Sequence, residues 1–449
     1  MQKVFRSSVC TTIFSIAAAL TVTDPSNLAA QATKTIDSVK ISRDALAKMT
    51  PRSGQRLAAS ALKNHSGPKL GAASKFASVP GIDSLTNWTG QFTAPGFDSN
   101  NNPQSVWPFE MVGNAPESNQ TAVLRAPIVP VTVKLLDQDG KVATNDGFPL
   151  IAKVTPTIVN AVVKSPLFQN WSYSSGVGQI NDQLMRAQFW NRIGRDDGSG
   201  GGGNWHTLLA PRVQTTRTMS IPFGSWAFTP NDNGSCCLAV FLDENAFISQ
   251  LFPPTFPVDN TTVIGAAELA GDVTTKDLST FLFNNVYLYS GDVSNCCVLG
   301  FHTYDFEPGI PANGNLERRY VLNYSSWITN GLFSHGFEDI TATSHEIAET
   351  FDDPFVDNAT PWWLSFDKFS GASLCQNNLE TGDVVEILRY NGVFPVSMNG
   401  RTYHPQNEAM FPWFAFQSPS KANLHAYSFP DETTLTALSP SPLHAGCVP

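Results

Sequence analysis

The sequence predicts an ordered protein of the α/β or α+β class. Hydrophobic residues make up 42% of the 449 residues and charged residues only 15%, a composition typical of globular rather than disordered chains. Segments rich in β-branched residues alternate with segments of helical period, which indicates a sheet packed against helices. The net charge of −10 argues against a nucleic-acid-binding surface.

The first expected element is a buried strand at residues 126–136, where β-branched side chains dominate. The elements expected after it are, in chain order, helices at 148–163 and 180–190, a glycine-rich loop at 195–204, a strand at 237–242, a helix-like stretch at 275–284 and a strand at 297–304. This mixture leaves α/β and α+β both open.

The N-terminus has the features of an export signal. Lys3 and Arg6 precede an apolar, uncharged stretch, and Ala30 and Ala32 have the small side chains that a signal peptidase reads. A membrane anchor is the alternative, but the apolar run is shorter than the roughly 20 residues that a span needs. We therefore expect residues 1–32 to be a signal peptide and the protein to be secreted or periplasmic, with no stable membrane span.

The rest of the chain divides into two regions. Residues 33–105 are predicted to be a polar leader or propeptide-like segment, because their first part has few aromatic residues and many Ala, Ser and Lys. Aromatic residues become frequent from residue 107 onward. Residues 106–449 are therefore expected to form a single α/β domain.

Export gives the cysteines a structural meaning. Of the 7 cysteines, Cys10 leaves with the signal peptide, and an even number in an exported chain indicates disulfides. The adjacent pairs Cys236-Cys237 and Cys296-Cys297 stand at the heads of similar apolar runs. We expect bridges between two neighbouring strands rather than within an adjacent pair, because disulfide geometry is narrow.

Residues 339–353 predict an amphipathic helix. Asp339 is a suitable N-cap, and the helix is expected to end at Asp353, just before a proline. At about 100° per residue, three apolar side chains form one seam toward the core, namely Ile340, Ile347 and Phe351.

The opposite face of this helix has metal-ligand chemistry. His345 and Glu349 lie one turn apart with Glu346 beside them, as in a His-Glu-x-x-His zinc helix whose second histidine is replaced by glutamate. Both side chains can reach one divalent ion, and Glu346 can then take a proton from a metal-bound water. The alternative is an exposed helix whose polar groups are solvated or merely hydrogen-bonded.

A third metal ligand is expected from the acidic turn downstream. Glu380 and Asp383 are both candidates, and Asp383 follows a glycine, which leaves it the freer to turn inward. His302 and His335 are further candidates, although each alone is more typical of a structural histidine. His404 can orient a ligand or a substrate group from behind.

The order of these motifs resembles a known family. His-Glu-x-x-Glu starting at His345 is followed by Asp-Pro at Asp353, a tryptophan, and Glu-x-x-Asp starting at Glu380. This order is similar to that of exordium-like (phosphate-induced) secreted proteins and their microbial relatives, as is the Gly-aromatic-His run ending at His302. The resemblance covers about residues 171–416. It implies a secreted protein with a zincin-like mixed sheet and a zincin-like active-site helix.

The chain departs from the family pattern at one position. The family has a cysteine two residues after the aspartate, where this chain has Val385. Cys375 can substitute from the other side of the turn.

These observations predict a secreted, metal-dependent hydrolase. The leading hypothesis is a zincin-like metallopeptidase that acts on an extracellular peptide or polymer, with Zn²⁺ or another divalent metal as cofactor. His345 and Glu349 would be ligands, Asp383 or Glu380 the third ligand, and Glu346 the general base. The alternative is a non-catalytic extracellular binding or structural protein with a structural metal site.

Overall fold

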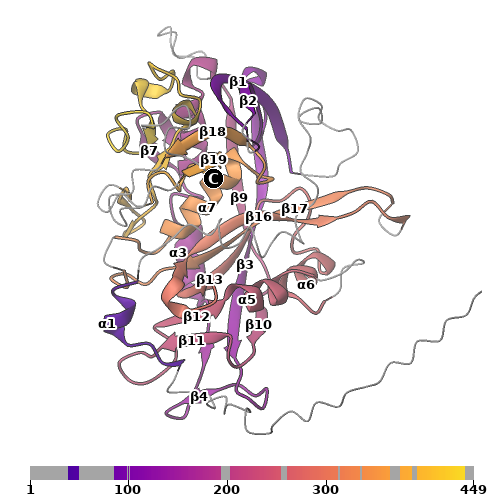
Figure 1. Cartoon of the computed structure of the whole chain (residues 1–449), viewed down its shortest axis with the longest axis vertical. Coiled ribbons are helices and arrows are strands. Elements are labelled where there is room, and N and C mark those ends of the chain that lie inside the picture. Colours follow the sequence, from indigo (N-terminus) through magenta and orange to yellow (C-terminus); the bar gives the residue numbers. More distant parts are fainter. Residues whose placement is uncertain are drawn as a thin grey trace, which may run out of the picture.

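The computed structural model describes residues 39–49, 85–98, 100, 102–193, 203–253, 260–311, 314–333, 336–364, 375–386 and 392–439. The expected signal peptide and most of the expected glycine-rich loop lie outside the described residues. The described part is a mixed α/β structure in which strands predominate (Figure 1).

A seven-stranded mixed sheet forms the centre of the molecule. Its longest strand, β3, has parallel partners on one edge, β9 along its first half and β10 along its second. On the other side β13 and β17 continue in parallel, and β16 closes the sheet antiparallel to β17. The sheet strands are β3 (Thr121–Leu135), β6 (Ile151–Ala152), β9 (His206–Val213), β10 (Arg217–Ile221), β13 (Ser279–Asn284), β16 (Gly300–Glu307) and β17 (Arg318–Trp327).

A second, four-stranded sheet has the order β11-β12-β14-β15, with bounds Trp226–Thr229, Ala239–Asp243, Val286–Tyr289 and Cys296–Val298. The helices are α1 (Arg43–Leu46), α3 (Pro156–Val163), α4 (Ile180–Gln188), α5 (Glu244–Leu251), α6 (Val263–Leu269), α7 (Thr341–Asp352) and α8 (Phe411–Phe414).

The remaining strands form two-stranded antiparallel pairs. They are β1 (Asn87–Phe97) with β2 (Pro103–Val112), β4 (Thr144–Asn145) with β5 (Phe148–Pro149), β7 (Trp171–Tyr173) with β8 (Gly176–Gly178), β18 (Ala359–Leu364) with β19 (Cys375–Asn378), β20 (Val396–Met398) with β21 (Arg401–Tyr403), and β22 (Glu408–Ala409) with β23 (Ser428–Phe429).

The central sheet separates two hydrophobic cores. Side chains alternate along a strand, so Leu282 of β13 packs into the core that contains α7, whereas Phe281 and Phe283 pack into the core that contains α5. We call these the α7-side core and the α5-side core. On β16, Tyr304 likewise joins the α7-side core and Phe301 the α5-side core.

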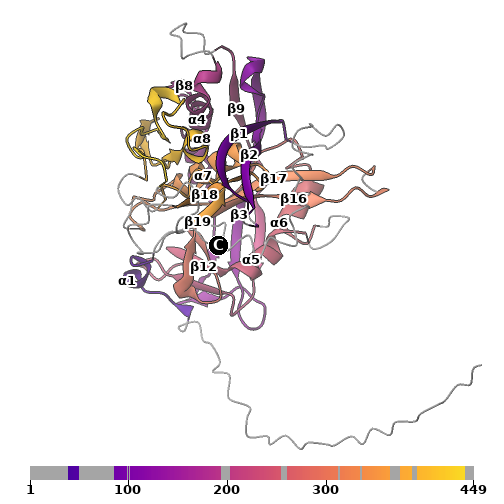
Figure 2. The ribbon, with the colours of Figure 1, turned by 45° about the horizontal axis from the view of Figure 1, so that its top comes forward.

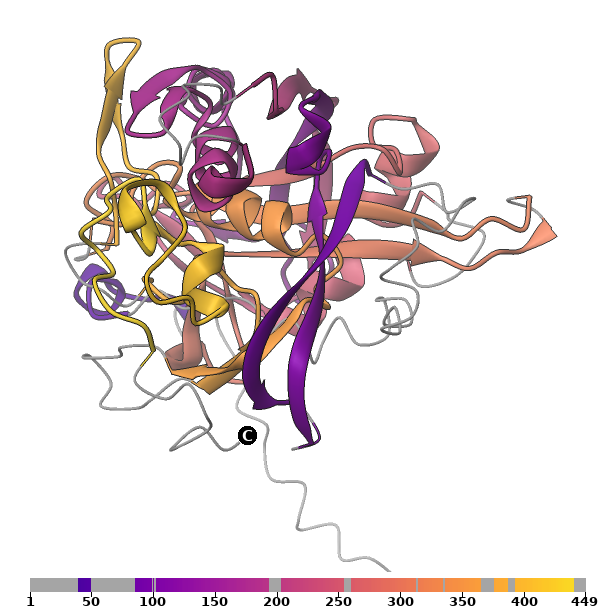
Figure 3. The same ribbon diagram turned by 90° about the horizontal axis from the view of Figure 1, so that it is seen from above.

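The β1-β2 hairpin belongs to the packed domain. It lies across the molecule beside β18 and α7 (Figures 2 and 3), and Trp88, Phe92 and Trp107 are buried in the α7-side core. The expected boundary between residues 105 and 106 therefore falls inside strand β2, and the hairpin on its N-terminal side packs with the domain.

Part of the expected leader is also attached to the domain. Residues 39–49 include α1, and Leu46 is buried in the α5-side core. Lys40 bridges in parallel to Phe228 of β11, and Ile41 N donates to Phe228 O at 2.8 Å.

Several expected elements need correction. The stretch expected to be helical at 275–284 contains strand β13 from Ser279 to Asn284 and no helix. The pattern was ambiguous because an apolar run buried on both faces shows no strand alternation. The helix expected at 148–163 is confined to α3, which starts at Pro156 with Thr155 as its N-cap. The strand at 126–136 and the helix at 180–190 are confirmed as β3 and α4.

The disulfide prediction is wrong for the two adjacent pairs. Cys236 is bonded to Cys237 and Cys296 to Cys297, rather than strand to strand. The first pair precedes β12 and the second begins β15. Strand β14 lies between β12 and β15 in the sheet, so these two strands are not neighbours. Cys375 is also disulfide-bonded.

Candidate metal centre

Helix α7 positions the predicted site. Its apolar seam of Ile340, Ile347 and Phe351 packs into the α7-side core, as expected. Its opposite face is not open to solvent, because every residue of the helix is buried against neighbouring elements that include β16 and β17. The alternative prediction of an exposed helix with solvated polar groups is therefore wrong.

The start of α7 differs from the prediction. Ile340 is the N-cap and makes no side-chain capping bond, so Asp339 is not the N-cap. Asp339 has a positive φ of 41° and its carboxylate accepts hydrogen bonds from the backbone N of Ile340 and of His404. Its Oδ2 also lies 2.8 Å from His404 Nδ1, so His404 lies next to the N-terminus of α7.

Two histidines converge on one carboxylate oxygen. His345 Nε2 lies 3.1 Å from Glu349 Oε2, and His302 Nδ1 lies 3.2 Å from the same oxygen. His302 comes from β16, where strand alternation turns it toward α7. The two imidazoles and the carboxylate are each no more than 5% exposed.

Three carboxylates share one arrangement, in which an N–H donor holds one oxygen and the other faces a histidine. Gly382 N donates to Glu349 Oε1 at 3.2 Å, which leaves Oε2 to the histidines. Gln376 Nε2 donates to Asp383 Oδ2 at 2.6 Å, and Asp383 Oδ1 lies 3.6 Å from His345 Nε2. Such outer donors are how proteins fix metal-ligating carboxylates.

The third of these carboxylates is Glu380. Asn378 Nδ2 donates to Glu380 Oε1 at 2.9 Å, and Glu380 Oε2 lies 3.9 Å from His302 Nδ1. Gln376 and Asn378 are two residues apart on β19, so they extend from the same side of that strand. One strand therefore orients both acids of the downstream turn.

Glu346 is arranged differently. Its Oε1 lies 3.9 Å from His345 Nε2 and its Oε2 lies 3.8 Å from His302 Nδ1, and within the described residues Oε2 has no hydrogen-bond partner. Burial raises the pKa of Glu346 to about 7, against the opposing effect of the histidines. Gly300 makes room for it, since a Cβ there would lie 2.5 Å from Glu346 Oε1.

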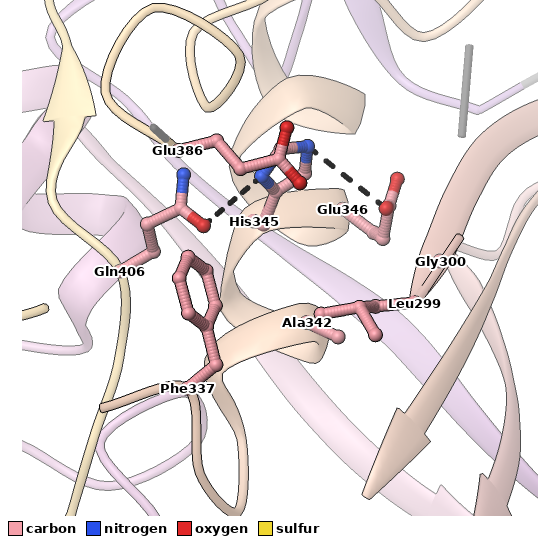
Figure 4. Close-up of a pocket in the computed structure, with 8 residues that line it drawn as sticks. All are labelled: Leu299, Gly300, Phe337, Ala342, His345, Glu346, Glu386 and Gln406. Atoms are coloured by element: carbon pink, nitrogen blue, oxygen red, sulfur yellow. Dashed lines mark hydrogen bonds and ion pairs between the residues drawn. The ribbon is translucent and has the colours of Figure 1, made fainter. Parts of the chain in front are cut away.

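A small pocket reaches His345 and Glu346. Figure 4 shows the two side chains facing it together with Glu386, Gln406 and Phe337. Gln406 Oε1 lies 3.2 Å from His345 Nδ1 and can accept a hydrogen bond from it, which leaves Nε2 directed at the carboxylates.

The electrostatics of the centre reflect this crowding of acids and imidazoles. Burial would lower the pKa of His302, but the nearby carboxylates of Glu346 and Glu349 outweigh it and raise the pKa to about 10. Burial would raise the pKa of Glu349, but His345 and His302 hold it below its ordinary value. Burial raises the pKa of Glu386 to about 8.

These buried groups can hold a divalent ion. His345 with Glu346 and Glu349, and His302 with Glu349 and Glu380, place their ligand atoms within 4.8 Å of one another. Buried carboxylate oxygens that accept no hydrogen bond are costly without a cation. Imidazole nitrogens and carboxylate oxygens are suitable donors for zinc and similar metals.

All five predicted site residues therefore meet in one place, and His302 joins them. His404 pairs with Asp339, and His335 lies outside the described residues. Four residues of the centre were not predicted from the sequence, namely Gln376, Asn378, Gln406 and Glu386. The alternating amides of Gln376 and Asn378, just before the acidic turn, were the available signal.

Comparison with protein-family models, curated proteins and solved structures finds no match to this chain. Within the described residues, none of the helices has the length and apolar character that crossing a membrane requires.

Proposed function

We propose that this protein is an exported, metal-dependent hydrolase, most simply a zincin-like zinc metallopeptidase acting on an extracellular peptide or polymer. His345, Glu349 and Asp383 would hold the ion. The bound metal would supply a water molecule acidic enough to be activated near neutral pH. Glu346 would accept the proton of that water and later deliver it to the leaving group.

The observation that carries this proposal is the difference between Glu346 and its neighbours. Glu349, Glu380 and Asp383 each have one oxygen fixed by an N–H donor, as ligands do. Glu346 has a pKa of about 7 and faces the pocket, as a general base should. Ligand and base thus have different surroundings within one helix.

The zincin-like and exported parts of the proposal have separate support. Helix α7 packs on the antiparallel edge of a mixed sheet, with His302 of edge strand β16 turned toward it. Residues before 33 have the charge and apolar pattern of a signal peptide.

The test uses purified full-length mature protein and two isosteric or truncating variants. Glu346→Gln should keep its metal and fold but lose about 10²- to 10⁴-fold of peptide hydrolysis in a substrate-library screen. Glu349→Ala should lose the metal as measured by elemental analysis. Glu338→Gln, a half-buried acid outside the centre, is the matched control and should change neither. Full activity of Glu346→Gln would refute the assigned mechanism.

A second candidate function is a non-catalytic extracellular protein in which the metal is structural. The low exposure of the ligands favours it, since His345, Glu349 and Asp383 are between 2% and 5% exposed. A structural site has no open coordination position. Acetohydroxamate added to Co²⁺-loaded protein should alter the visible spectrum if the pocket reaches the ion, and should leave it unchanged if the metal is enclosed.

A further inference from the structure

The buried centre contains two groups of ligand atoms rather than one. One consists of His345, Glu346 and Glu349, and the other of His302, Glu349 and Glu380. Only Glu349 belongs to both, and the two histidines do not share a group. Two ligands of one ion, each about 2.0–2.2 Å from it, lie at most about 4.4 Å apart. The histidines are therefore placed as ligands of two neighbouring positions.

The second group is built from elements outside α7 apart from Glu349. His302 belongs to β16 and Glu380 to the turn after β19. His302 is 4% exposed and Glu380 is 0% exposed. Within the described residues, neither His302 Nε2 nor Glu380 Oε2 has a hydrogen-bond partner.

The orientation of Glu380 supports a cation in this group. Asn378 occupies its Oε1, and its Oε2 faces His302 Nδ1 at 3.9 Å. The carboxylate of Glu349 is another close neighbour. A buried oxygen facing an imidazole nitrogen and a second carboxylate is stabilised best by a metal ion between them.

Several buried acids surround the two groups of ligand atoms. With both imidazoles neutral, as metal ligation requires, no side chain in either group is positive. The buried carboxyl groups in and around the centre are Glu346, Glu349, Glu380, Asp383, Glu386 and Glu408.

We propose that the centre binds two divalent ions, the second between His302, Glu349 and Glu380, with Glu349 bridging them. This inference rests on the proposed function for the first ion, at His345 and Glu349. Glu349 Oε2 lies 3.2 Å from one histidine and 3.1 Å from the other, as a shared ligand must. Paired ions of this kind stand about 3.5–4 Å apart in hydrolytic centres, where both contact the reacting oxygens. In this proposal His302 and Glu380 are ligands of the second ion rather than packing residues.

The experiment is a metal titration of the full-length mature protein after removal of bound metal. Zn²⁺ is added in excess, unbound ion is removed, and bound ion is counted by elemental analysis. Wild type should retain two ions per chain, and Glu380→Gln and His302→Gln one each. His404→Gln, a histidine outside the centre, should retain two. Circular dichroism and thermal melting establish that each variant is folded.

A second measurement needs no variant. Mn²⁺-loaded wild type should give the electron paramagnetic resonance spectrum of a spin-coupled pair, because a carboxylate bridge couples the ions. One ion per chain, lost in Glu349→Gln but kept in Glu380→Gln, would overturn the second site and leave the proposed function standing. No bound ion in wild type would overturn both.

Discussion

The two cores on either side of the central sheet both contain clusters of aromatic side chains, but they differ in the polar groups beside them. In the α5-side core Phe247 packs against Phe283, Phe301 and Tyr324 in tilted and edge contacts. The α7-side core has an equivalent aromatic group in which Phe109, Phe189 and Phe411 contact one another. Two histidines and several carboxylates lie beside α7, and the pocket at His345 and Glu346 is lined by apolar residues of the α5-side core, namely Leu299, Phe337 and Ala342.

One strand separates the two environments. Phe301 and His302 are neighbours on β16, and alternation directs the first to the α5-side core and the second to the metal centre. Aromatic burial on one face thus stabilises the strand that positions a ligand on the other. The aromatic group of the α5-side core should therefore determine stability, and the histidines and carboxylates beside α7 should determine metal binding.

The largest effect should come from emptying the α5-side core. Phe247→Ala removes a ring that is 0% exposed, and we expect a loss of about 3–5 kcal/mol in the free energy of unfolding. Denaturant titration measures it. Metal content per folded chain should stay at the wild-type value, because no ligand contacts this ring. A variant that stays stable but loses metal would contradict the division between the cores.

A smaller and more local effect is expected from two glycines. A Cβ at Gly382 would overlap the ring of His345, and one at Gly300 would overlap the carboxylate of Glu346. Such overpacking costs about 1–3 kcal/mol, so Gly382→Ala should weaken zinc affinity roughly 10- to 100-fold. Gly300→Ala should instead keep zinc affinity and lose hydrolysis.

Zinc competition with a fluorescent chelator and a hydrolysis assay separate these two outcomes. Gly224→Ala is the control for adding a methyl group, since nothing lies within 4 Å of that position, although its positive φ adds some strain. Equal losses of affinity in the Gly300 and Gly382 variants would mean that ligand and base are not distinct.

The smallest effect concerns pH. Burial raises the pKa of Glu346 from 4.5 to about 7, and that of Asp352 from 3.8 to about 8. Both folded values exceed the unfolded ones, so the protonated acids stabilise the metal-free fold below about pH 4, and this is lost as pH rises through 7 to 8. His302, with its pKa raised to about 10, acts in the same direction.

The metal-free protein should therefore melt a few degrees lower at about pH 9 than at about pH 5. The increase in Tm on adding Zn²⁺ should grow over the same range, because the ion neutralises carboxylates that are then ionised. Calorimetry with and without metal measures both. A zinc-induced shift that shrinks with rising pH would show that the ion does not bind these groups.

Local patterns in the sequence predicted the parts of the molecule that depend on local order. Helical spacing brought His345, Glu346 and Glu349 together, and β-branched residues marked β3. Alternation was absent in β13, which is buried on both faces, so an apolar run could be interpreted as helix or strand. The disulfides depended on chain geometry at adjacent residues, which spacing alone does not report.

The site could be predicted only in part, because some of its residues come from distant segments of the chain. His302 precedes α7 by a long stretch of chain, and its place beside Glu349 follows from β16 being the edge strand next to that helix. Gln376 and Asn378 bind acids only 7 and 2 residues away, so their alternation before the acidic turn was a usable local signal. Gln406 contacts His345 across 61 residues, and long-range packing determines that contact.

The segment around Lys40 has a consequence for self-association. Strand β11 ends the four-stranded sheet, and the free edge of such a strand can pair with another molecule. The contacts of Lys40 and Ile41 with Phe228 cover that edge, and Arg43 adds an ion pair to Asp232 at 2.9 Å. A chain that begins at Leu85 should expose the edge and form aggregates detectable by light scattering. Residues 39–49 should therefore protect this sheet edge from pairing with another molecule.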